Sequence, residues 1–340
     1  MKFIKGFFKF IWNLLVIIVA VVIIFFGFMI FRSDGFDKKY IGEEYDVDQA
    51  DKIKVILDCD NSLGSFWEVD DGLVLSYLLN KPEADLLGIT TTFGNRTYDH
   101  KYTVNMLYKV GRTDIPLFKG EQTPDDGITE AAIFLAETVA MYPGEVSIIA
   151  AGPVGNLEAA YQYDKNFFKN VKQITVMGGY TEDLTMGKRE VDELNLSADY
   201  KASYEMLNSG AKITVMTGQA CLDAPFKFSD FSKLKTFPVD WEFFCVFWTV
   251  LNKLGTGNDY FVVWDMLPTT YIFHPEYFEE NEVYINSVLE DLEKGMLKIS
   301  ESKKGSLINM PEGIKDKDAF YIDMFQNLNK QGRFERYKLN

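Results

Sequence analysis

The chain has 340 residues, of which 47% are hydrophobic, so it can form one large domain or two small ones around a sizeable core. Its net charge of −15 and its lack of a basic stripe argue against nucleic-acid binding. Three cysteines without metal-ligand spacing argue against a disulfide framework, and two histidines are too few for a polyhistidine zinc site.

A long apolar run near the N-terminus predicts a membrane span. Residues 11–31 are interrupted only by Asn13 and Gly27, and about 20 apolar residues cross a bilayer core. The alternative, a cleaved signal peptide, is disfavoured because the run is too long and no A-x-A site follows it. We expect a cytoplasmic tail at 1–10, a single-pass transmembrane helix at 11–31, a linker at 32–50 and a domain at 51–340. The expected location is the cell membrane, with the N-terminal helix in the lipid bilayer and the domain outside the cell.

From residue 51 onwards, short apolar runs alternate with segments of helical spacing. Strands are predicted at 54–57, 86–92, 173–177 and 212–217, and within 111–120 and 146–152. Helices are predicted at 72–79, 98–110, 131–141, 156–163 and 197–209. Later in the chain we expect a helix at 243–254, a strand or hairpin at 295–301 and a helix at 319–329. This alternation predicts an α/β fold with a mostly parallel, Rossmann-like open sheet and helices on both faces.

Acidic side chains are concentrated after the first predicted strand. Asp58 and Asp60 follow that strand, and the pair Asp70 and Asp71 precedes the first helix, so we expect them in one acidic loop. Open α/β sheets bind ligands at the carboxyl ends of their strands. So many acids in one loop are unfavourable unless a cation or a substrate uses them. A haloacid-dehalogenase phosphatase also begins with a strand and D-x-D, but that interpretation leaves the second acidic pair unexplained.

One further carboxylate, Asp265, lies in the apolar run 260–273. Burying it is costly unless it is paired or binds a metal. The alternative interpretation is a helix N-cap.

Several motifs in order resemble the calcium-dependent nucleoside hydrolases. The segments DCD, DDG and GITTTFGN resemble the family's D-x-D-P-G-x-D-D and G-I-T-T-x-x-G-N patterns, and GRTDIPLFKG follows them. Later matches are IIAAGPVGNLEAA, ITVMGG, Glu193-Leu194-Asn195 and Trp264-Asp265. The resemblance covers about residues 52–330. It implies an inosine/uridine-preferring nucleoside hydrolase-like N-ribosyl hydrolase that uses Ca²⁺.

The resemblance also implies residue roles. Calcium would be held by Asp60, Asp71, Asp265 and the backbone carbonyl of Ala151, and Asp60 would accept a proton from the bound water. The ribose hydroxyls would be held by Asp70, Asn95, Glu193 and Asn195. Asp58 is interpreted as a residue that orients the site. Taken singly, Asn95 could be a turn residue, Glu193 a solvated acid and Asn195 a helix cap.

The chain departs from the family pattern at three places. Trp264 stands where many members have a histidine, which resembles the purine-preferring members, whose aromatic residue stacks on the base and eases its departure. Trp67 is the candidate for a second stacking residue, and packing in the core is the alternative role for Trp264. The stretch 61–69 is longer than the family's P-G-x, and the segment after Gly120 is shorter than the family's flap.

Two hypotheses follow from different functional classes. The first is a membrane-anchored hydrolase of ribonucleosides, with a preference for purines and a role in purine salvage. The second is a surface-anchored, nucleoside hydrolase-like binding protein with little or no catalytic activity. The resemblance also implies a homo-oligomer, and the membrane span offers a second route to association.

Overall fold

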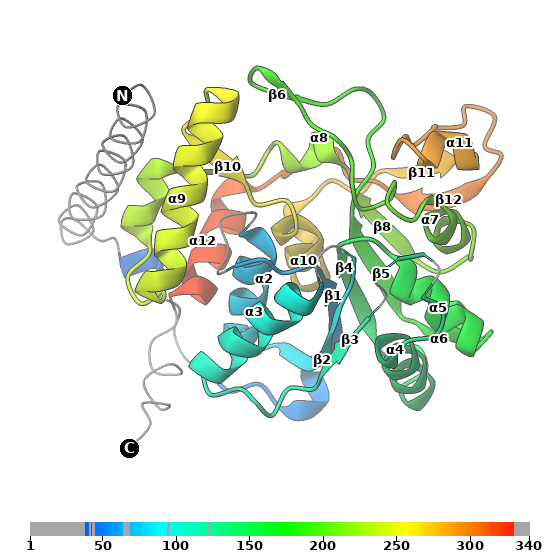
Figure 1. Ribbon diagram of the computed structural model, residues 1–340, viewed down its shortest axis with the longest axis horizontal. Coiled ribbons are helices and arrows are strands. Elements are labelled where there is room, and N and C mark those ends of the chain that lie inside the picture. Colours follow the sequence, from blue (N-terminus) through cyan, green and yellow to red (C-terminus); the bar gives the residue numbers. More distant parts are fainter. Residues whose placement is uncertain are drawn as a thin grey trace, which may run out of the picture.

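A computed structural model describes residues 38–40, 42, 45–63, 69–93, 96–120, 123–124 and 126–329. Within these ranges the chain forms one eight-stranded sheet with helices on both faces (Figure 1). In spatial order its strands are β11 (Glu282–Ile285), β12 (Ser306–Asn309), β8 (Ile213–Met216), β5 (Gln173–Met177), β4 (Ser147–Ala151), β1 (Ile53–Cys59), β2 (Ala84–Thr91) and β3 (Leu117–Lys119). All neighbouring strands are parallel except β11 and β12. The predicted mostly parallel α/β sheet is therefore confirmed.

The apolar runs form strands because the central strands are buried on both faces. In β1, Val55 and Leu57 join one apolar cluster, whereas Ile56 joins the cluster on the other face. A strand that is covered on both sides needs a continuous apolar run rather than an alternating one.

Each face of the sheet has its own layer of helices. The first layer contains α2 (Asp70–Asn80), α3 (Arg96–Lys109), α10 (Met266–Phe273) and α12 (Lys317–Leu328). The helix α9 (Val239–Thr256) joins the same apolar cluster from outside this layer (Figure 1). The second layer contains α4 (Glu130–Met141), α5 (Gly155–Tyr163), α6 (Phe167–Asn170), α7 (Tyr200–Leu207) and α11 (Leu289–Leu292). The remaining elements are α8 (Gly218–Cys221), the 3₁₀ turns η1 (Lys38–Tyr40), η2 (Gln49–Asp51), η3 (Phe228–Lys233) and η4 (Pro275–Tyr277), and the antiparallel pairs β6 (Thr185–Met186) with β7 (Arg189–Glu190) and β9 (Pro225–Lys227) with β10 (Tyr260–Val262).

The expected acidic loop is wrong for its second carboxylate pair. Asp70 and Asp71 are the first two residues of α2, which begins two residues earlier than the predicted helix. A helix N-terminus carries a partial positive charge, so carboxylates are favourable in its first turn.

The strand or hairpin predicted at 295–301 is also wrong. This segment makes only two isolated bridges, from Met296 to Tyr180 and from Ile299 to Ile285. It crosses between two different parts of the fold, so it never runs beside one partner long enough to form a ladder. The late strands are instead β11 and β12, which lie on either side of it in the sequence.

The predicted tail and membrane span, residues 1–31, lie outside the described residues. Among the residues that are described, no helix is long and apolar enough to cross a membrane. The described part of the predicted linker includes η1, which lies on α12. The ring centroid of Tyr40 lies 5.4 Å from that of Phe325 in α12. The backbone carbonyl of Tyr40 accepts a hydrogen bond from Asn329 Nδ2.

Candidate active site

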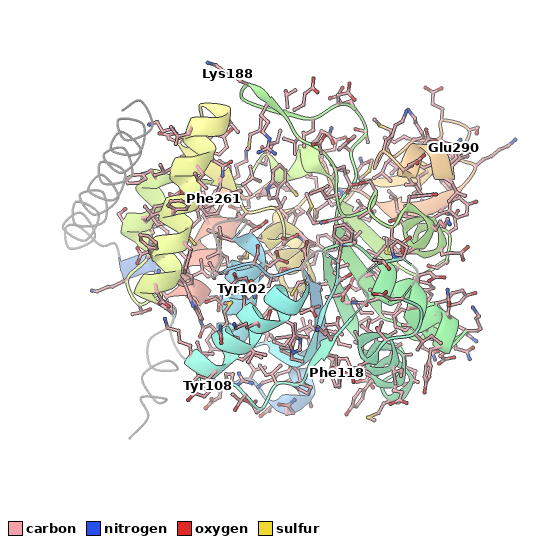
Figure 2. The ribbon with its side chains drawn as sticks, in the orientation of Figure 1. Tyr102, Tyr108, Phe118, Lys188, Phe261 and Glu290 are labelled. Carbon is pink, nitrogen blue, oxygen red and sulfur yellow. The ribbon has the colours of Figure 1, made fainter. Side chains whose placement is uncertain are left out.

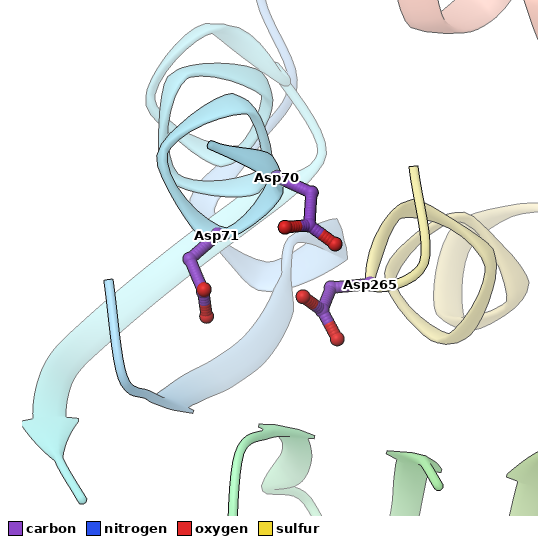
Figure 3. Close-up of side chains that lie close together, drawn as sticks. All are labelled: Asp70, Asp71 and Asp265. Atoms are coloured by element: carbon purple, nitrogen blue, oxygen red, sulfur yellow. The ribbon is translucent and has the colours of Figure 1, made fainter. Parts of the chain in front are cut away.

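Three carboxylates converge at the carboxyl end of the sheet. Each of Asp70, Asp71 and Asp265 offers an oxygen, and these oxygens all lie within 4.8 Å of one another (Figure 3). Asp70 and Asp71 come from the first turn of α2, and Asp265 is the residue before the first turn of α10. All three side chains are buried. Two helix N-termini therefore meet at one acidic point, and their dipoles partly offset the negative charge.

The electrostatics of this group favour either a bound cation or a shared proton. Burial raises the pKa of Asp265 well above its usual range, and the charges of Asp70, Asp71 and Asp60 raise it further. Burial also raises the pKa of Asp70, although hydrogen bonds from the Asp265 carboxyl and from backbone N–H groups oppose that shift. Like charges this close cannot all stay ionised in a buried site without a compensating positive charge or a shared proton.

Asp265 does not act as a helix cap. It occupies the N-cap position of α10, yet its side chain makes no capping hydrogen bond. Its Oδ1 is buried without a hydrogen-bond partner among the described residues. An orphaned carboxylate oxygen beside two other carboxylates forms an all-oxygen donor set, which fits a hard divalent cation such as Ca²⁺.

Asp60 lies beside this group rather than within it. It follows β1 and lines the same cavity as the three carboxylates, and so does Ala151 at the end of β4. A Cβ built on Gly152 would lie 3.0 Å from Asp60 Oδ1, so a glycine there leaves room for this carboxylate. Of the predicted calcium ligands, the structure thus brings Asp71 and Asp265 together with Asp70, and places Asp60 and Ala151 at the cavity wall.

Asp58, near the end of β1, is held by side chains of two neighbouring elements. Its Oδ1 accepts hydrogen bonds from Thr90 Oγ1 at 2.6 Å and from Asn156 Nδ2 at 2.7 Å. Burial raises the pKa of Asp58 to about 7, against the lowering effect of these two hydrogen bonds. Asp58 therefore ties β1 to β2 and α5, in keeping with its predicted orienting role.

The carboxylates form one side of a cavity that is partly open to solvent. Small-molecule sites are typically concave and carry a few convergent polar groups. Glu193 and Asn195 lie on its wall, as predicted. Both Glu193 oxygens already accept backbone N–H groups, from Gly179 and Leu196 at Oε1 and from Ser197 at Oε2. Asn195 donates from Nδ2 to the Met177 carbonyl. These contacts fix the loop, and the ribose roles of the two residues stay predictions.

Two other predicted binding residues, Asn95 and Trp67, lie outside the described residues. Trp264 is half-buried, packs against the core of the first helix layer and also lines the cavity. Its core role and its expected contact with the base are thus compatible.

The cavity has one wall that the sequence reasoning missed as a binding element. Leu184 and Val191, which flank the β6–β7 hairpin, line the cavity, and Lys188 lies at the outer tip of the hairpin (Figure 2). The tip is fixed to the end of α9, because Lys188 N donates to the Thr256 carbonyl at 3.2 Å. The sequence feature that could have indicated this wall is the long charged stretch before Glu193.

Comparisons with known proteins show which family the chain resembles. Residues 55–322 match the family model for "Inosine-uridine preferring nucleoside hydrolase". A probable uridine nucleosidase 2 of Arabidopsis thaliana is 30% identical over 195 residues, which are 48% of this chain and 58% of that protein.

Two solved structures share the fold. A plant nucleoside hydrolase superposes with a TM-score of 0.71 at 20% identity, over 82% of this chain and 99% of that one. A purine-preferring ribonucleoside hydrolase from Gardnerella vaginalis gives 0.69 at 18% identity, over 82% and 100%. The chain belongs to the inosine-uridine preferring nucleoside hydrolase family.

Proposed function

We propose that this protein hydrolyses the N-glycosidic bond of ribonucleosides, giving ribose and a free base. The observation that carries the proposal is the convergence of buried Asp70, Asp71 and Asp265 beside a cavity at the carboxyl end of the sheet. Water supplies the oxygen that is added to C1′ of the ribose, and the base leaves with the electrons of the broken bond and gains a proton. The reaction passes through an oxocarbenium-like transition state, as in other glycoside hydrolysis.

Different residues of the chain would bind the cation, accept the proton and hold the ribose. Asp71 and Asp265, with Asp60 and the carbonyl of Ala151, are the groups that would hold a divalent cation, which we expect to be calcium. When bound, such a cation lowers the pKa of a water molecule and orients it. Asp60, which lines the cavity, would accept a proton from the bound water. Asp70 would hold a ribose hydroxyl.

The experiment is a measurement of ribose release from inosine and uridine by the wild type and by Asp265→Asn. The substitution keeps the shape of the side chain but removes the charge, so we expect turnover to fall by at least about 100-fold. Asp51→Asn, an exposed acid in η2, is the matched control and should retain wild-type turnover. Full activity in Asp265→Asn would refute the proposed mechanism.

We propose further that purine nucleosides are preferred. The half-buried indole of Trp264 lines the cavity next to Asp265, where it can stack on a purine. The related proteins differ in their named substrates, since the Arabidopsis protein is named for uridine and the Gardnerella protein for purines. We expect kcat/KM to be higher for inosine than for uridine. Trp264→Leu should lower the inosine value about 10-fold more than the uridine value, whereas faster turnover of uridine by the wild type would reject the preference.

We also propose that residues 11–31 anchor the protein in the cell membrane, with the enzyme domain outside. The support is the apolar character of that stretch, which only Asn13 and Gly27 interrupt. Full-length protein should sediment with membranes and should be digested by protease added to intact cells. Recovery of the full chain in the soluble fraction would contradict the anchor.

A further inference from the structure

The two helices that carry the acidic group at their N-termini are joined to each other at their C-termini. The C-cap residue of α2 is Lys81, and the C-cap residue of α10 is His274. Lys81 Nζ lies 2.8 Å from His274 Nε2, although the two residues are 193 positions apart in the sequence. The same two helices therefore meet at both ends.

A carboxylate from a third helix contacts both Lys81 and His274. Asp323 of α12 accepts a hydrogen bond from Lys81 Nζ at 2.6 Å, and its Oδ1 lies 3.4 Å from His274 Nε2. Tyr77 of α2 donates to Asp323 Oδ2 at 2.6 Å, and Asn327 donates to Oδ1 at 3.1 Å. We call Lys81, His274 and Asp323 the Lys81 cluster.

The Lys81 cluster is buried at an energetic cost. The side chain of Lys81 is only 2% exposed and that of Asp323 is 11% exposed. Apolar residues of similar volume often stabilise a fold as well as a buried ion pair does, because both charges must lose their water. What the charged pair adds is a fixed geometry, since its hydrogen bonds are satisfied in one arrangement of the three helices.

From these contacts we infer that Lys81, His274 and Asp323 are positioning residues for the active site. They fix the angle between α2 and α10, and so hold Asp70 and Asp71 against Asp265 at the other end. With 11 and 8 residues, the helices are about 16 Å and 12 Å long. A tilt of about 5° at the cluster would therefore move the far end of α10 by about 1 Å. An error of that size costs about 100-fold in turnover when catalytic groups must be aligned.

The test uses the full chain with the paired substitutions Lys81→Met and Asp323→Asn. The pair is needed because removing one partner alone would leave an unpaired buried charge and could unfold the protein. At a temperature where the variant is fully folded, we expect calcium titrated into chelator-treated protein to bind about 10-fold more weakly than to the wild type. A crystal structure of the variant should show Asp265 displaced from Asp71.

A second ion pair provides the control. Lys54 and Glu145 are joined at 2.7 Å and lie on neither α2 nor α10. Lys54→Met with Glu145→Gln should leave both calcium affinity and carboxylate positions unchanged. If the Lys81 cluster only stabilised the fold, Lys81→Met with Asp323→Asn would lower the melting temperature but leave calcium affinity and carboxylate positions unchanged.

The inference rests on the proposed function for its calcium readout, but the positions of the carboxylates test it independently. If wild-type protein neither binds calcium nor releases ribose, the proposed function fails, and the crystal structure still decides the positioning role. A folded double variant with carboxylates in their wild-type places, and with any calcium affinity within about twofold of wild type, would overturn the inference.

Discussion

At the scale of single residues, the surroundings of each buried acid determine what it can do. Asp58 and Asp265 are both buried, but only Asp58 has its carboxylate held by two side-chain donors. Asp265 has neither a capping bond nor a partner for Oδ1 among the described residues. Oδ2 of Asp58 is likewise buried without a partner among the described residues, but of the two acids only Asp265 lines the cavity. Asp58 therefore supports the framework, and Asp265 can reach a ligand.

Two substitutions of Asp58 separate its hydrogen bonds from its charge. Asp58→Asn keeps an oxygen that can accept from Thr90 and Asn156, so the free energy of unfolding should change by less than about 1 kcal/mol. Asp58→Ala strands both buried donors and should cost about 2–4 kcal/mol. Urea unfolding of the two variants checks this expectation, and equal losses would contradict it.

The pH dependence of stability should report on His274. Burial alone would lower the pKa of His274, but its hydrogen bonds with Asp323 and Glu276 raise the pKa above the ordinary 6.5, against repulsion from Lys81. A raised pKa stabilises the fold below the unfolded value, and this contribution is lost as the pH rises through the folded value. The wild type should thus exceed His274→Gln in stability by more at about pH 6 than at about pH 8.5. Urea midpoints at the two pH values measure the difference, and a larger difference at the higher pH would reject this assignment.

At the scale of elements, the start of α2 depends on a close contact with the chain that follows β1. A Cβ built on Gly72 would lie 2.2 Å from Leu63 Cβ, an atom attached directly to the backbone that cannot rotate away. Gly72 therefore lets the loop after Asp60 pass over the helix that carries Asp70 and Asp71.

Two glycine-to-alanine substitutions test this contact. Gly72→Ala should lower the free energy of unfolding by about 1–3 kcal/mol, because the new methyl group has no space. Gly255→Ala lies in α9, where a Cβ meets nothing within 4 Å, and should raise stability by about 0.5–1 kcal/mol. Thermal unfolding of both variants gives the signs, and a stabilised Gly72→Ala would show that the loop can yield.

At the scale of the whole molecule, the order of strands and helices up to about residue 217 was predictable from local pattern. The alternation of apolar runs and helical segments predicted the parallel sheet, and the carboxyl end of its first strand predicted the edge where Asp60 lies. The cost of burying a carboxylate in an apolar run also predicted that Asp265 is paired or binds a metal, and the structure places the carboxylates of Asp70 and Asp71 beside it.

Other features depend on contacts between distant parts of the chain, which local periodicity does not encode. Nothing in the local sequence around Lys81 or His274 indicates that the two side chains meet. Only the packing of α2, α10 and α12 brings them together. The β6–β7 hairpin became a cavity wall because its tip is fixed to the end of α9. The resemblance implies that Asp70 binds the ribose, and only the structure shows that its carboxylate also lies beside those of Asp71 and Asp265.

The dependence of ribose release on calcium tests the proposed mechanism most sharply. Chelator-treated wild-type protein would be assayed with inosine while calcium is added back stepwise. We expect no turnover without calcium and a saturable return of activity as the site fills, with no return in Asp265→Asn. Undiminished ribose release in the presence of chelator would contradict it.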